Sequence, residues 1–160
     1  TPKVSATLKG NGGPEVIISM QRPALLASAA LRVMHPKLYL ALVTTQINLA
    51  RWAVESGLRD VCTCLQFWAS VFNCVSVICN RQCPLHRDPR STPEGFDIMT
   101  SVGHYGDGVM TLSNLGIQLQ YNSGVMVACS GHIVRHGVTC TGDRIVWAWF
   151  MRDSLHNFVG

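Results

Sequence analysis

The sequence lacks several features that would mark it as something other than a folded globular chain. Charged residues make up only 14% of its 160 residues, and no low-complexity tract interrupts it. No apolar run approaches the ~20 residues that span a bilayer, and no signal-peptide pattern opens the chain. Because 48% of the residues are hydrophobic, we expect one folded domain with a substantial core and no membrane partner.

The net charge does not identify a binding partner, and the cysteines indicate a reducing compartment. Lys and Arg number 13 against 9 acidic residues, and the net charge of +4 is compatible with a polyanionic partner without requiring one. The 7 cysteines are an odd count and fall mostly in apolar segments, which predicts free thiols in a reducing, intracellular compartment. A structural zinc bound by Cys62, Cys64, Cys79 and Cys83 is an alternative, which the helix predicted around the first two disfavours.

The hydrophobic period changes near Ser70. Residues 1–22 include several glycines and predict an N-terminal arm, with a short strand over residues 15–20. Residues 23–70 repeat apolar side chains every three to four positions and predict a helical support layer. Residues 71–160 alternate with period 2 and predict a β core within the same single domain. Strands are expected at residues 72–79, 96–104, 109–112, 117–121, 125–129, 132–139 and 144–151, with one more around His86.

Helices followed by many short strands predict a mostly β fold with N-terminal helices, namely a jelly roll with the helices packed on one sheet. The last predicted strand is apolar on both sides. Arg144, Val146, Ala148 and Phe150 share one side, which we expect to face the interior, because a buried cation needs a partner more than a tryptophan does. The two tryptophans on the other side would then lie under the helices.

The stretch from Asn80 to Ser91 holds the triplet His86-Arg87-Asp88. On an extended backbone, its imidazole and its carboxylate point to the same side. With a second histidine they form the 2-His-1-carboxylate set that binds Fe(II) on one face and leaves the other positions open. His132 and His136 are four residues apart and would share a strand face, but the H-x-V…G-x-R spacing to Arg144 favours His136.

With these residues in this order, the sequence resembles the 2-oxoglutarate/Fe(II) dioxygenases of the double-stranded β-helix fold. In that superfamily the second histidine ligand precedes an arginine that binds the far carboxylate of 2-oxoglutarate, which a guanidinium can do bidentately. The resemblance implies that His86, Asp88 and His136 are the metal ligands and catalytic centre, and that Arg144 binds the cosubstrate. It implies Fe(II) and 2-oxoglutarate as cofactors, with O2 as cosubstrate.

Residues 72–81, 84–88, 121–124, 130–138 and 142–153 resemble the fungal branch of the TET/JBP oxygenases, over roughly residues 36–158. Those enzymes oxidise the 5-methyl group of pyrimidines in DNA. The resemblance implies a 5-methylcytosine dioxygenase that acts on a flipped base in DNA, and hence a nuclear protein, expected to be a monomer. Two alternatives stay open: the same chemistry on N-methylated bases such as N6-methyladenine or on a protein side chain, and a cupin-like binding domain without turnover.

The family match also suggests contacts around the reacting centre. Ser91, Phe150 and Arg152 correspond to residues that contact the target base, with Phe150 as the stacking aromatic. Asn80 and His104 correspond to further cosubstrate contacts, although Gln82 replaces the tyrosine that accompanies the asparagine in relatives. Phosphate contacts at the mouth of the site are expected from Arg81, Arg87, Arg90, Arg135 and Arg152.

Overall fold

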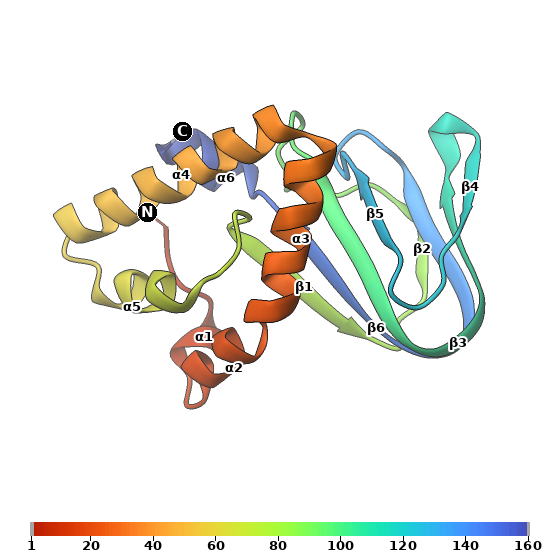
Figure 1. Cartoon of the computed structure of the whole chain (residues 1–160), viewed down its shortest axis with the longest axis horizontal. Coiled ribbons are helices and arrows are strands. Elements are labelled where there is room, and N and C mark those ends of the chain that lie inside the picture. The colour runs from red at the N-terminus through yellow and green to blue at the C-terminus, as the bar shows by residue number, and fades with distance from the viewer. Residues whose placement is uncertain (1, 160) are drawn as a thin grey trace. The chain divides into compact units, whose positions relative to one another are not determined.

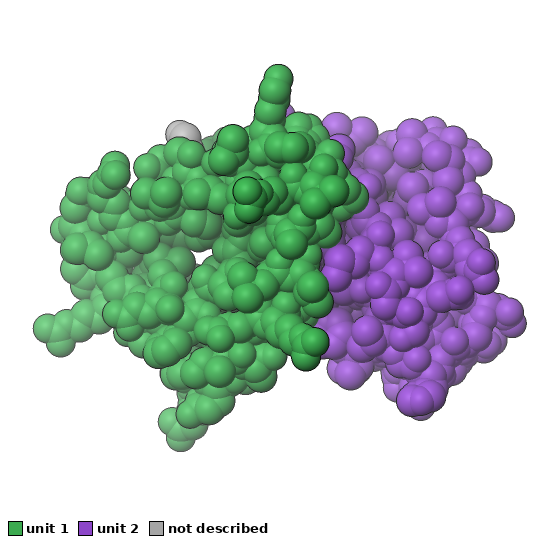
Figure 2. Space-filling view, in the orientation of Figure 1, with its two compact units in different colours: residues 1–73, 155–160 green, residues 74–154 purple. Residues whose placement is uncertain are grey.

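The computed structural model describes residues 2–159. The chain divides into two compact units, which Figure 2 colours separately. One unit comprises residues 1–73 and 155–160 and is called the helical unit here. The other comprises residues 74–154 and is called the sheet unit.

The helical unit confirms the helices predicted after residue 23. Its elements are α1 (Ala6–Lys9), α2 (Gly13–Ser19), α3 (Gln21–Met34), α4 (Pro36–Glu55), α5 (Arg59–Phe67) and most of α6 (Asp153–Val159). Helix α3 buries Ala24, Ala27, Ser28 and Leu31 at helical spacing. Helix α4 begins with a proline at its first position, where the missing N–H costs nothing.

The prediction of a strand over residues 15–20 is wrong, because residues 15–19 lie in α2 and Met20 is its C-cap. Its β-branched residues suggested a strand, but Gly13 and Ile17 are buried one helical turn apart. The expected N-terminal arm thus contains two short helices, α1 and α2. Among the described residues, no single helix is long and apolar enough to cross a membrane. Helices α2 and α3 reach that length and composition only as a pair bent by 49°.

The sheet unit contains six strands, all paired in antiparallel fashion (Figure 1). They are β1 (Cys74–Cys79), β2 (Cys83–His86), β3 (Asp97–Leu112), β4 (Ile117–Gln120), β5 (Met126–Cys129) and β6 (His136–Phe150). The order is β1-β6-β3-β4, with β2 also on β6 and β5 also on β3. One end of β6 therefore pairs with β1 and the other with β2, so the sheet can fold over into two layers. The predicted fold class, strands with helices in a jelly roll, is confirmed.

Two long strands replace four of the predicted short ones. Residues 96–104 and 109–112 lie together in β3, and residues 132–139 and 144–151 largely in β6, which starts at His136. Gly106, Asp107 and Gly108, which separate two of the predicted strands, form a register shift between Gly106 and Val109 instead of a turn. At Gly103 any side chain would collide with the backbone carbonyl of Asp143, so glycine here lets β3 approach β6.

The cysteine chemistry agrees with the prediction of free thiols, since all 7 cysteines are unpaired. The alternative of a structural zinc is not supported. Within residues 2–159, the one group of histidine, cysteine and acidic side chains close enough to hold a metal ion contains no cysteine.

Candidate active site

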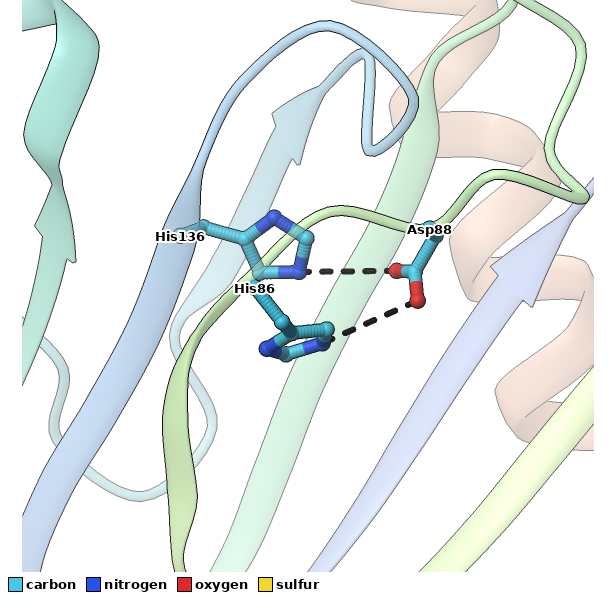
Figure 3. Close-up of side chains that lie close together, drawn as sticks. All are labelled: His86, Asp88 and His136. Carbon is cyan, nitrogen blue, oxygen red and sulfur yellow. Dashed lines mark ion pairs between the residues drawn. The ribbon is translucent and has the colours of Figure 1, made fainter.

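The structure brings together the two histidines and the aspartate predicted to bind metal (Figure 3). His86 ends β2 and His136 begins β6, and the register makes them direct cross-strand partners. Cross-strand partners have adjacent side chains on one face, and the two ring centroids lie 4.5 Å apart. Asp88 follows two residues later, with its backbone N–H donating to the Gly131 carbonyl at 2.8 Å.

The distances suit a shared metal ion. His86 Nε2 lies 3.6 Å from Asp88 Oδ1, and His136 Nε2 lies 3.5 Å from Asp88 Oδ2. Three ligand atoms, one from each residue, lie within 4.8 Å of one another. Adjacent ligands of an octahedral ion at ~2.1 Å are separated by ~3 Å, and both histidine–aspartate distances are close to this value. The donor set is the two imidazoles and one carboxylate that non-haem Fe(II) enzymes use.

Backbone carbonyls orient both imidazoles. His86 Nδ1 lies 2.8 Å from the Pro84 carbonyl, and His136 Nδ1 lies 2.9 Å from the Val134 carbonyl. When neutral, each ring donates its Nδ1–H to the carbonyl, which leaves the Nε2 lone pair for the metal. His132 instead has Nδ1 2.9 Å from the Ser91 carbonyl and lies outside the group. The spacing argument that favoured His136 over His132 agrees with this placement.

The charges of the site prepare it for a cation. The hydrogen bond with His136 lowers the pKa of Asp88 below its usual value, against the opposing effect of burial. Burial would lower the pKa of His136, but the Asp88 carboxylate and the Val134 carbonyl raise it overall. Because a metal ion binds the deprotonated imidazole, metal affinity is expected to increase with pH.

These residues line a cavity of about 330 Å³ in the sheet unit, within the size range of small-molecule sites. Its lining includes Arg144, Val146, Ala148 and Phe150, the side of β6 that was predicted to face inward. Only 3% of Arg144 is exposed. Its Nη2 donates to the Arg81 carbonyl at 3.1 Å, whereas its Nη1 is buried without a partner. A buried guanidinium held only by a carbonyl fits a site for an anion such as a carboxylate.

The structure does not bring the other two predicted cosubstrate contacts into this cavity. The Asn80 side chain donates to Asp143 Oδ1 at 2.9 Å and accepts from the Arg144 backbone N–H at 2.8 Å. Asn80 therefore fixes the backbone of Arg144 and is absent from the cavity lining. His104 is exposed on β3 opposite Asp143, also outside the lining.

All three predicted base contacts, Ser91, Phe150 and Arg152, line the cavity. Ser91 and Arg152 are joined by an isolated β-bridge. The Ser91 hydroxyl donates to Asp97 Oδ2 at 2.9 Å, which leaves the lone pairs of its oxygen to accept a hydrogen bond from a base.

Among the cavity residues that sequence reasoning gave no role are two buried titratable ones, Asp97 and Tyr121. Asp97 is a carboxylate at the start of a strand whose next residues are apolar, and that contrast was the available signal. Tyr121 belongs to one of the family-like segments, but a tyrosine beside turn residues looks ordinary in sequence. Both are buried, at 3% and 0% exposure.

We predict that Asp97 makes the metal-free protein less stable as pH rises. Burial raises its pKa to about 7, the nearby Asp88 charge adds to this effect, and the Ser91 hydroxyl opposes it. An acid whose pKa is higher in the folded state than in the unfolded state contributes its full stabilisation at pH values below the unfolded-state pKa. That stability is lost between about pH 4 and about pH 7, by on the order of a few kcal/mol.

Urea unfolding at pH 5 to 8 with a chelator present measures this effect. Asp97→Asn is expected to remove most of the loss of unfolding free energy across this range. Glu94→Gln, at an exposed carboxylate on the preceding loop, should keep the wild-type pH dependence. Parallel losses in wild type and Asp97→Asn would contradict the prediction.

An antiparallel jelly roll whose cavity holds two histidines, an aspartate and a buried arginine defines the class of 2-oxoglutarate/Fe(II) dioxygenases. The chain matches the Tet_JBP family model, the oxygenase domain of the 2OGFeDO superfamily, over residues 5–153, and it belongs to this family. The superfamily uses Fe(II) and 2-oxoglutarate, for which the site described above has suitable residues. No curated protein matches the chain. The family match begins well before the resemblance noted at residue 36, so it includes helices α1 to α3.

Proposed function

We propose that this protein hydroxylates the methyl group of 5-methylcytosine in DNA. The reaction would consume 2-oxoglutarate and O2 and yield 5-hydroxymethylcytosine, succinate and CO2. The observation that carries the proposal is the single cavity shared by the metal-binding group, the buried Arg144 and the aromatic Phe150.

Each of these residues has a defined task in the proposal. His86 and His136 would hold Fe(II) through Nε2, and Asp88 would hold it through a carboxylate oxygen. Arg144 would bind the far carboxylate of 2-oxoglutarate and so fix the direction of the keto acid in the cavity. Bound Fe(II) and 2-oxoglutarate supply the oxidising chemistry, and the protein supplies position and exclusion of water. Phe150 would support the base by stacking.

A DNA substrate is supported by family membership and by charge. The TET/JBP family acts on DNA, and the exposed residues Arg90 and Arg152 both line the cavity, where they can meet phosphates. A methyl group in paired DNA cannot reach a buried metal, so the target base would have to flip out of the duplex. We also propose that the protein belongs to the fungal branch of the TET/JBP family, is located in the nucleus and acts as a monomer.

The direct test incubates the protein with Fe(II), 2-oxoglutarate and a duplex oligonucleotide containing 5-methylcytosine. Mass spectrometry is expected to show 5-hydroxymethylcytosine and an equal amount of succinate. Parallel reactions with N6-methyladenine DNA and with a peptide pool test the other substrates. Product in only one of those reactions would replace the proposed substrate, and no succinate in any reaction would favour a binding domain without turnover.

We predict that Phe150→Leu separates base recognition from cosubstrate binding. Stacking of a base on an aromatic ring contributes ~1–3 kcal/mol, so kcat/KM for 5-methylcytosine DNA is expected to fall roughly tenfold or more. Affinity for 2-oxoglutarate should stay at the wild-type value, because leucine preserves the apolar surface beside Ala148. An unchanged kcat/KM would remove Phe150 from the base site.

A further inference from the structure

A second buried carboxylate lies beside the metal-binding group, and the proposed function gives it no task. Asp97 begins β3, is 3% exposed and lines the cavity. It is not one of the three residues of the metal-binding group. Burial of a carboxylate is unfavourable unless hydrogen-bond donors surround it, so the donors around Asp97 indicate what it does.

Two turns determine where two of the metal-binding residues lie. In the first turn, residues 88–91, a backbone hydrogen bond of 3.1 Å closes the turn that begins at Asp88. In the second turn, residues 130–134, a backbone hydrogen bond of 2.8 Å closes the turn, and the Val134 carbonyl orients the ring of His136 at 2.9 Å. Both turns lie between strands, so their positions depend on the contacts that they make with each other and with the sheet.

The side chain of Asp97 joins the two turns. Its Oδ2 accepts a hydrogen bond from the Ser91 hydroxyl of the first turn at 2.9 Å. The backbone N–H of Gly131, in the second turn, also acts on this carboxylate as a hydrogen-bond donor. The turns meet directly as well, because the Asp88 backbone N–H donates to the Gly131 carbonyl at 2.8 Å.

The lack of a side chain at Gly131 makes this arrangement possible. An added Cβ would collide with Asp97 Oδ2 and would lie 3.1 Å from Asp88 Oδ2. Both carboxylates therefore approach the same point of the backbone. Asp97 is itself fixed, because it is paired with Cys129 in the register of β3 and β5. The sheet thus supports both turns through one side chain.

We infer that Asp97 is a positioning residue of the metal site, which holds the turns of Asp88 and His136 in the arrangement that binds the ion. Replacement of residues that orient metal ligands typically costs about 10–100-fold in metal affinity. A bound cation also makes the buried negative charge of Asp97 less unfavourable. The inference rests on the metal site and is independent of which methylated compound is the substrate.

Calorimetry of Mn(II) binding to the full chain, without DNA and without O2, tests this role. Asp97→Ala removes the charge and both hydrogen bonds, so its affinity for Mn(II) is expected to be about tenfold or more below that of wild type. Asp97→Asn also removes the charge but keeps an acceptor oxygen for Ser91, so its affinity should lie between those two values. At saturating Co(II), the visible absorption spectrum of Asp97→Ala should differ from that of wild type, because it reports the arrangement of the ligands.

Two further variants separate the hydrogen bonds of Asp97 from its charge. Ser91→Ala leaves the charge in place and breaks the link to the first turn, so it should weaken Mn(II) binding, by less than Asp97→Ala does. Glu94→Gln is the matched control, because it removes an exposed carboxylate from the loop before Asp97. It should keep the Mn(II) affinity and the Co(II) spectrum of wild type.

Wild-type Mn(II) affinity in Asp97→Ala would overturn the inference. Equal affinities in Asp97→Ala and Asp97→Asn, with the wild-type Co(II) spectrum in both, would overturn it too, because Asp97 would then act through its charge alone. If Asp97→Ala does not fold, wild-type affinity in both Asp97→Asn and Ser91→Ala has the same meaning. If the variants bind Mn(II) as expected but wild type oxidises no methylated base, the proposed function fails and the inference stands.

Discussion

Replacing His136 by alanine should abolish both metal-dependent stabilisation and the proposed oxidation of methylated DNA. Wild type at a Mn(II) concentration 100 times its dissociation constant gains ~2.7 kcal/mol. For a chain of this length, this corresponds to a melting temperature higher by roughly 5–10 °C. In His136→Ala we expect no such rise and no detectable 5-hydroxymethylcytosine, because two ligands cannot hold the ion at the required position.

His132→Ala controls for the loss of an imidazole close to the site. His132 lies four residues before His136, but its ring nitrogen contacts the Ser91 carbonyl and it lies outside the metal-binding group. The variant should keep the Mn(II)-induced rise in melting temperature. If His132→Ala loses the rise and His136→Ala keeps it, the assignment of the third ligand is wrong.

The sequence predicted which three side chains come together at the candidate metal site, because local geometry determines most of this arrangement. His86 and Asp88 are two residues apart on extended backbone, so their side chains share a side whatever the rest of the chain does. The inward face of β6 followed from a similar argument, since alternate residues from Arg144 to Phe150 share one side. The third ligand could not be predicted from local geometry alone, because the choice between His132 and His136 depended on the spacing to Arg144.

The sequence could not predict contacts that depend on long-range packing. Asn80 looked like a cosubstrate contact, but the pairing of its loop with β6 turns its amide toward Asp143 and the Arg144 backbone. Tyr121 enters the cavity because the chain after β4 pairs with Gly108. Strands β3 and β6 were each predicted as two short strands. The glycines in the middle of each one resemble a turn when the strand that pairs with it is unknown.

Replacing Arg144 by lysine should weaken 2-oxoglutarate binding roughly hundredfold while leaving the metal site intact. Charge-assisted hydrogen bonds contribute ~1.5–3 kcal/mol each, and the single ammonium of lysine cannot copy the planar fork of arginine. We therefore expect a much higher KM for 2-oxoglutarate and a kcat that largely recovers at saturation. Arg135→Lys, at an exposed arginine outside the cavity lining, should leave both constants unchanged.

Arg144→Met is expected to stabilise the ligand-free protein although it weakens ligand binding. This combination distinguishes a binding role of Arg144 from a structural one. Without a bound anion, the guanidinium is buried with one carbonyl partner and one free nitrogen. Its removal should therefore raise the unfolding free energy of the ligand-free protein by about 1–3 kcal/mol, measured by urea unfolding. If Arg144 stabilised the fold, its replacement would lower the unfolding free energy of the protein. If Arg144 serves to bind a carboxylate, its replacement raises the unfolding free energy of the ligand-free protein and abolishes ligand binding, because the bound anion was the partner that made its burial favourable.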